Sequence, residues 1–153
     1  MKKLYLTIVL LILTFSFANA QNKNEMFVES ASKFGFEETV TKLSEEVSAK
    51  GWKVLVTHNL QESLKKSGYE VLPVKIMEIC NPKHSVRLLE LDNERIYSNM
   101  MPCRISVYEK SDGKTYISRM NSGMLAVQIG GIVEEVMNSA TNDMEEMIKA
   151  VLD

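Results

Sequence analysis

The only two cysteines lie in short stretches that could carry out chemistry, Ile79-Cys80-Asn81-Pro82 and Met101-Pro102-Cys103-Arg104. Cys80 directly precedes a strong helix start, where unpaired backbone N–H groups stabilise a thiolate. Arg104 adjoins Cys103 and could add positive charge, and His84 lies one turn into the predicted helix. Such a cluster could support thiol redox chemistry, or it could bind a small ligand, a soft metal or a haem iron.

Two structural interpretations compete with this functional one. If the strands that end at Cys80 and begin at Cys103 are antiparallel neighbours, both residues lie at one end of the sheet, within reach of a disulfide. By closing the loop between the two cysteines, that bond would stabilise the fold by about 3 kcal/mol through the reduced entropy of the unfolded chain. The sequence favours this disulfide over two buried free thiols. The spacing matches neither C-x-x-C nor a zinc pattern. The predicted site is Cys80, Asn81, His84, Cys103 and Arg104, with Cys80 as the more reactive thiol.

Other residues with chemical potential have plainer interpretations. His58 ends a predicted strand at the opposite end of the sheet from the cysteines, either as a partly buried histidine or as a ligand at a second site or dimer interface. Most methionines fit core packing, whereas the Met100-Met101 pair beside Cys103 could serve a soft metal. Two acidic pairs are expected on solvated helix faces, Glu134-Glu135 and Glu145-Glu146. No catalytic set and no cofactor can be named from the sequence.

Hydrophobic periodicity predicts the elements that position these residues. Strands are expected at residues 25–32, 52–58, 69–80, 103–109 and 115–120. Pro73 within the third suggests an edge strand, a bulge or a strand that starts later. Helices are expected at residues 36–50, 61–66, 82–91 and 132–152. Residues 93–100 are expected to form a loop, and 121–131 cannot be assigned. Short connections between consecutive strands favour an antiparallel sheet covered by two main helices, which makes a two-layer α+β domain.

Apolar residues at helical spacing define the expected inner face of each helix. In the helix at 36–50 these are Phe36, Val40, Leu43 and Val47. In the helix at 82–91, Val86 and Leu89 are expected to face inward, with Leu88 and Leu91 widening that face. In the last helix the inward set is Val133, Val136, Met137, Ala140, Met144, Met147, Ile148 and Val151.

The N-terminus has the pattern of a cleaved signal peptide. Lys2 and Lys3 precede an apolar run, and Ala18-Asn19-Ala20 supplies a cleavage site before Gln21. We therefore expect export of residues 21–153, as one domain, to the periplasm or the exterior, with no membrane segment after cleavage. Removing residues 1–20 leaves 16 basic and 20 acidic residues, which argues against a nucleic-acid partner.

Several motifs in fixed order resemble a known family. They are Phe36-Glu37-Glu38-Thr39-Val40, Cys80-Asn81-Pro82 and Met101-Pro102-Cys103-Arg104 leading into Val107-Tyr108-Glu109, then Gly113 and the long last helix. The chain resembles the domain of unknown function 302 family from about residue 30 to 153. The resemblance implies a TATA-binding-protein-like β-α-β4-α fold, often a homodimer, and no established reaction. Asn121-Ser122 stands where the family often has a proline, and many members lack the cysteines.

Three functions remain open from the sequence. The favoured one is a non-enzymatic module that binds a small ligand or an envelope protein, because no recognisable catalytic set is present. The alternatives are a thiol-based redox or sulfur-carrier protein that uses Cys80 and Cys103, and a soft-metal or haem-binding protein at the same end of the sheet.

Overall fold

The computed structural model of the chain describes residues 26–152, so the predicted signal peptide lies outside the described residues. The strands are β1 (Phe27–Ala31), β2 (Lys53–Asn59), β3 (Val74–Cys80), β4 (Cys103–Glu109) and β5 (Thr115–Met120). The helices are α2 (Phe36–Ala49), α3 (Leu60–Lys66), α4 (Pro82–Leu89), α5 (Ser122–Ala126), α6 (Gly131–Lys149) and the 3-10 helix η1 (Glu94–Met100).

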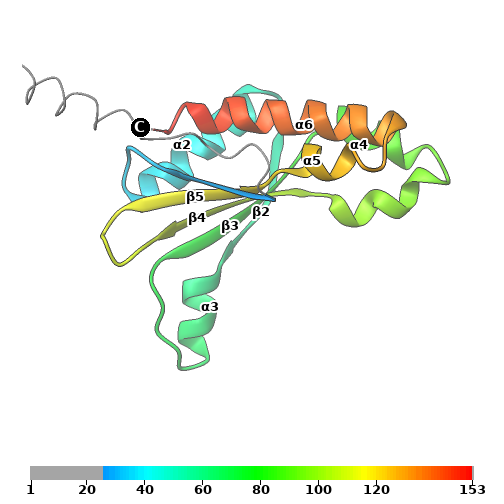
Figure 1. Cartoon of the computed structure of the whole chain (residues 1–153). Coiled ribbons are helices and arrows are strands. Elements are labelled where there is room, and N and C mark those ends of the chain that lie inside the picture. The colour runs from blue at the N-terminus through cyan, green and yellow to red at the C-terminus, as the bar shows by residue number, and fades with distance from the viewer. Residues whose placement is uncertain (1–25, 153) are drawn as a thin grey trace, which may run out of the picture.

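The five strands form one antiparallel sheet in the order β1-β5-β4-β3-β2. Figure 1 shows α2, α4, α5 and α6 on one side of this sheet, whereas α3 projects on the other side. The expected two-layer α+β fold, with a short helix inserted between the third and fourth strands, is confirmed. Among the helices that the structure describes, none combines the length and apolar character needed to cross a membrane.

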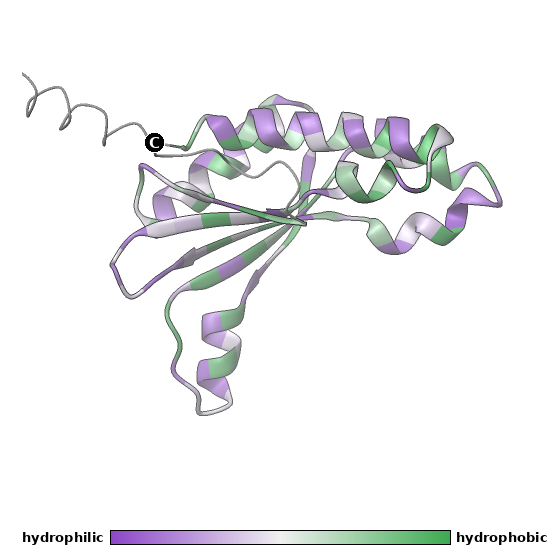
Figure 2. Ribbon diagram, viewed as in Figure 1, coloured by the Kyte–Doolittle hydropathy of each residue, from purple (hydrophilic) through white to green (hydrophobic). Residues whose placement is uncertain are grey.

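The core lies between the sheet and its covering helices. Strand alternation buries Ile105 and Val107 of β4 and Ile117 of β5 on the helix side. The main cluster joins them to α2 and α6 through Leu43, Val47, Met144, Met147 and Ile148. A second cluster around Leu88, Ala126, Val133, Val136 and Met137 lies where α4, α5 and α6 meet. Figure 2 shows apolar residues alternating with hydrophilic ones along α6, as expected of an amphipathic helix.

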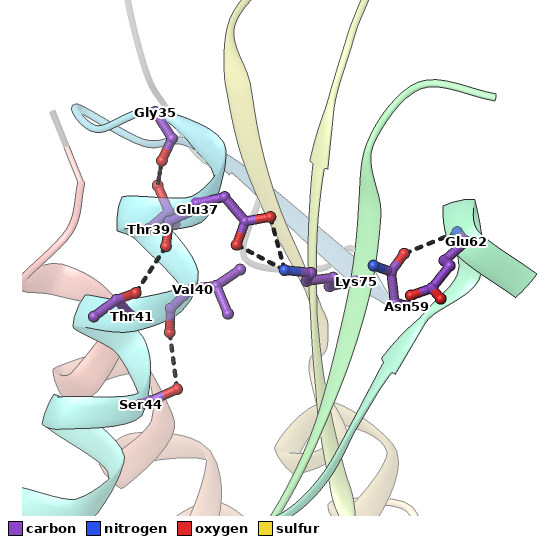
Figure 3. A network of polar contacts seen from close by, with 9 residues as sticks. All are labelled: Gly35, Glu37, Thr39, Val40, Thr41, Ser44, Asn59, Glu62 and Lys75. Atoms are coloured by element: carbon purple, nitrogen blue, oxygen red, sulfur yellow. Dashed lines mark hydrogen bonds and ion pairs between the residues drawn. The ribbon is translucent and has the colours of Figure 1, made fainter.

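Polar contacts fix how the helices join the sheet. The Lys75 Nζ of β3 donates hydrogen bonds to both carboxylate oxygens of Glu37 in the first turn of α2, at 2.8 and 2.7 Å (Figure 3). On the other side of the fold, the Asn59 side chain accepts a bond from the Glu62 N–H at 3.0 Å and caps α3 (Figure 3). These contacts connect the N-terminus of α2 to β3 and the N-terminus of α3 to the edge strand β2.

The structure corrects three expectations about local elements. Strand β3 begins at Val74: the Pro73 carbonyl still accepts from the Glu109 N–H at 3.0 Å, but proline has no N–H to donate to the ladder. Most of the expected loop at residues 93–100 forms η1 (Glu94–Met100), and the unassigned stretch contains α5. In α4 only Leu88 is buried, and Val86 is 43% exposed. The reason is that α4 packs at the end of the sheet against α6 and η1, so it presents one narrow edge instead of a broad face.

Helix α3 and the segment up to Pro73 form an arm that stands away from the core. No residue of α3 is buried, and Leu60, Leu64, Tyr69 and Leu72 are all exposed. The Gln61 side chain donates to the carbonyl of Val71 at 3.1 Å and closes the arm on itself. The arm therefore keeps its shape largely through its own capping and hydrogen bonds.

Candidate functional site

Four of the five predicted site residues line one cavity at the end of the sheet. Cys80, Asn81, His84 and Cys103 share it with Trp52 and with residues of α6. The sheet brings the cysteines together because β3 ends where its antiparallel neighbour β4 begins. The cavity has a volume of about 20 Å³, which is room for a single water molecule and not for an organic substrate.

The strand register explains why the two cysteines are free thiols in the structure. Ile79, not Cys80, is the residue paired with Cys103. Cys80 is one residue beyond the position directly opposite Cys103, and successive residues of a strand point to opposite faces. The two cysteine side chains therefore do not face each other as a disulfide requires. The expected disulfide is therefore not formed here, although both residues lie at the same end of the sheet as predicted.

The start of α4 holds Cys80 through two hydrogen bonds of Ser85. Asn81 caps this helix by accepting from the Lys83 N–H at 3.0 Å, as its sequence predicted. The Ser85 hydroxyl donates to the Asn81 carbonyl at 3.2 Å and lies 3.1 Å from Cys80 Sγ. Because the hydroxyl proton is used on the carbonyl, Cys80 acts as the donor to Ser85.

His84 is positioned by α6 and not by a thiol. Its Nε2 lies 2.9 Å from Asp143 Oδ2, and Trp52 Nε1 donates to the same oxygen at 3.0 Å. The rings of Trp52 and His84 are tilted, with centroids 5.5 Å apart. The carboxylate therefore fixes the orientation of both rings and ties α4 to α6. Asp143 could not be identified from the sequence, because it lies 59 positions from His84 and approaches it only through the fold.

Arg104 is not part of the cavity, although it adjoins Cys103. As a neighbour in the strand it points to the other face, where its Nε and Nη2 lie 3.2 and 3.1 Å from Glu78 Oε1. His58 lies 3.5 Å from the same oxygen. His58 pairs with Ile76 while Lys53 pairs with Cys80, so His58 lies away from the cysteine end of the sheet, as expected.

A larger pocket, which the sequence did not predict, lies beside the small cavity. We call it the groove; its volume is about 690 Å³. It is lined by Ile96, Tyr97, Asn99, Met100, Met101, Pro102, Cys103, Arg104, Met120, Ser122, Leu125, Gln128, Ile129 and Met144. Its walls include η1 and α5, the two elements that the sequence did not predict as helices, together with the segment after α5, the ends of β4 and β5, and α6. The available signal was a set of apolar residues in those stretches without a place in the expected core.

Cys103 lines both the cavity and the groove. Burial, together with the nearby Cys80, raises the pKa of the Cys103 thiol to about 11. The side chain is therefore a protonated thiol at neutral pH and a poor nucleophile. Across the described residues, no group of three or more His, Cys, Asp or Glu side chains has the arrangement of a metal site.

The match to a known family covers nearly the whole described fold. The family described as "Domain of unknown function DUF302" matches residues 28–153. The chain belongs to the DUF302 family. A crystal structure of an uncharacterized conserved DUF302 protein from Bacillus stearothermophilus is similar, with a TM-score of 0.74 and 23% identity over 82% of this chain and 98% of that chain. At this identity the likeness establishes the DUF302 fold alone. No curated protein matches the chain.

Proposed function

We propose that this DUF302 domain is a non-enzymatic module that binds a small ligand in the groove. The observation that carries this proposal is the size of the groove. Its volume of about 690 Å³ suits an organic ligand, since small-molecule sites typically measure about 300–1,000 Å³. The small cavity that holds both thiols has no such room.

The composition of the groove supports the same function. Apolar side chains such as Ile96, Leu125 and Ile129 line it together with a few polar ones, among them Asn99 and Gln128. Sites for small molecules combine predominantly apolar walls with a few placed polar groups in this way. Methionines in the wall add adaptability, because their unbranched side chains repack easily around a ligand.

The state of Cys103 favours binding over thiol catalysis. A redox enzyme or sulfur carrier needs an accessible thiolate, whereas burial keeps this thiol protonated. A thiol titration with and without reductant tests the remaining alternative. Two reactive thiols per denatured chain before reduction support the free-thiol form, and none before reduction supports the expected Cys80–Cys103 disulfide.

The binding proposal can be tested with the fluorescent apolar anion 1-anilinonaphthalene-8-sulfonate. Ile96 lines the groove and is 70% exposed, so Ile96→Gln should fold normally and, by removing apolar contact without adding charge, weaken probe binding by about tenfold. Val127 is 58% exposed and does not line the groove, so Val127→Gln is the matched control and should bind as the parent does. Equal binding by the parent and Ile96→Gln would refute the proposal.

The proposed setting follows from the N-terminal sequence and the family. Export would place the domain in the periplasm or outside the cell, with a second copy of the chain, a small ligand or an envelope protein as its partner. Light scattering of the purified protein distinguishes a monomer from a homodimer, and a visible spectrum of protein taken from the periplasm tests for haem.

A further inference from the structure

The groove reaches from the helix layer to the opposite face of the sheet. Arg104 points away from the helices, because its neighbour in β4, Ile105, is buried beneath them. The pairing of Ile105 with Arg119 places Met120 next to Arg104 on that second face. Met144, which lines the groove from α6, is 2% exposed, whereas the Arg104 side chain is 67% exposed. The groove therefore has a buried end and an open end.

The charge of the lining residues has one sign. Arg104 is the one charged residue among them, and none of these residues, all within the described part of the chain, is Asp, Glu or His. The other polar side chains of the wall are neutral, namely Tyr97, Asn99, Ser122 and Gln128. A buried charge needs a partner of opposite sign. A cationic ligand finds no such partner in the wall, whereas an anionic ligand finds a guanidinium at the open end.

Arg104 keeps one edge of its guanidinium for a ligand. Its Nε and Nη2 lie 3.2 and 3.1 Å from Glu78 Oε1, which leaves Nη1 on the outer edge. A guanidinium has five N–H donors, and its planar fork matches the geometry of a carboxylate. Glu78 does not line the groove, but it balances part of the Arg104 charge. The open end therefore suits a ligand with a single negative charge.

We propose that the groove binds an amphipathic molecule with one carboxylate, the class to which fatty acids belong. Its apolar part lies against Ile96, Leu125 and Ile129, and its carboxylate accepts hydrogen bonds from Arg104 at the open end. This inference rests on the proposed function, because it takes the groove as the ligand site and names the class of ligand. Binding is reversible and forms no covalent bond.

The test compares decanoate with 1-decanol, which has the same chain without the charge. Displacement of the uncharged fluorescent probe N-phenyl-1-naphthylamine from the protein measures the affinity of each. Arg104→Gln should weaken decanoate binding by about tenfold, because it removes a hydrogen bond to a charged group, and should leave 1-decanol binding unchanged. Arg95→Gln is the matched control, since Arg95 is 64% exposed, pairs with Asp92 and does not line the groove. It removes the same net charge and should bind both compounds as the parent does.

A second variant predicts a gain of affinity, which misfolding does not produce. Glu78→Gln removes the carboxylate that competes for Arg104, so decanoate binding should strengthen by about threefold or more. Binding of 1-decanol should stay the same. Unchanged decanoate affinity in both Arg104→Gln and Glu78→Gln overturns the carboxylate site, as does an equal loss of decanoate and 1-decanol binding in Arg104→Gln.

The uncharged probe separates this inference from the proposed function. If Ile96→Gln weakens binding of the probe while the parent and Arg104→Gln bind decanoate equally, the groove remains the ligand site and the carboxylate site alone is overturned. If Ile96→Gln leaves binding of the probe unaffected, the proposed function is overturned whatever the decanoate result. Loss of decanoate binding in Arg104→Gln, with 1-decanol binding retained, supports the inference.

Discussion

Among the described residues, Arg119 is the only charged residue that is buried. Its side chain is 1% exposed, and it donates to both carboxylate oxygens of Glu145 on α6 at 2.7 and 2.5 Å and to Ser30 Oγ at 2.8 Å. Glu145 was expected on a solvated helix face together with Glu146. The structure shows instead that the two acids have different roles, because only Glu145 pairs with a buried cation.

Removing the Glu145 carboxylate should therefore be costly. Glu145→Ala would leave the Arg119 charge buried with only a hydroxyl as partner, and we expect a loss of about 3 kcal/mol in the free energy of unfolding. Glu146→Ala is the control, because Glu146 pairs with an exposed Lys50, and it should change stability by less than about 0.5 kcal/mol. Urea unfolding measures both values. Equal effects would show that the Arg119–Glu145 pair is dispensable.

The raised pKa of Cys103 predicts how its reactivity depends on pH. In Cys80→Ser, which retains only Cys103, iodoacetamide should react slowly at pH 8 and faster as pH rises, because burial, the larger cause of the raised pKa of the Cys103 thiol, remains after Cys80 is removed. Cys103→Ser retains only Cys80, which should react faster at pH 8 than Cys103 does in Cys80→Ser, in line with the sequence prediction that Cys80 is the more reactive thiol. Urea-denatured Cys80→Ser should react readily at pH 8. Equal native rates for the two variants would contradict the prediction.

The raised pKa of the Cys103 thiol also makes the free energy of unfolding depend on pH. The neutral thiol of Cys103 is favoured in the folded state, so its contribution is complete below the pKa of an unfolded thiol. As pH rises above that value, the unfolded chain ionises first and the folded state loses stability through about pH 11. Cys103→Ser should remove this part of the alkaline loss of stability.

At the scale of elements, α6 provides the clearest test of which face is buried. Val136 is 2% exposed and contacts the cluster around α4 and α5, so Val136→Asp puts an unpaired charge into the core. We expect the variant to unfold or aggregate. Glu135, its neighbour, pairs with Arg87 on the surface, and Glu135→Ala should cost less than about 0.5 kcal/mol. Circular dichroism and thermal unfolding compare the two, and similar small effects would contradict the assigned face.

Elements with strong periodicity or clear caps could be predicted from the sequence. The inner faces of α2 and α6 follow the helical period, and Asn81 marks the start of α4. The buried set of α4 could not be predicted, because Val86 and Leu89 become exposed only through the position of the helix at the sheet end. Helices η1 and α5 have seven and five residues, too few to show a period. They form because η1 packs against α4 and α5 packs against α6.

The candidate site was predicted only as far as topology allowed. The shared sheet end of Cys80 and Cys103 followed from β3 and β4 being antiparallel neighbours. The exact register of β3 and β4 could not be predicted from this topology. In the structure it places Ile79, one residue before Cys80, opposite Cys103. Strand alternation could have assigned Arg104 to the opposite face from Cys103, since the two are adjacent in β4. The groove depended on η1 and α5 and so was missed with them.

At the scale of the whole molecule, export predicts which residue begins the mature protein. Protein recovered from a secreting host should begin at Gln21, because Ala18-Asn19-Ala20 precedes it as a cleavage site. N-terminal sequencing or intact mass measures this directly. Ala20→Pro should block cleavage and leave the longer chain, and Ala31→Pro, outside the recognition pattern, should not affect the cleavage position. Retention of residues 1–20 in the parent protein would refute the prediction.

The arm formed by α3 and the segment up to Pro73 has a consequence for protein engineering. Because no residue of α3 is buried, opening the arm exposes no core, and its amide protons should exchange through local opening while those of β3 and β4 wait for global unfolding. Foreign sequence inserted near Gly68, whose φ is +85° in the turn of the arm, would be tolerated for the same reason. The arm is thus where a fluorophore, an affinity tag or a second domain can be attached while the groove is studied.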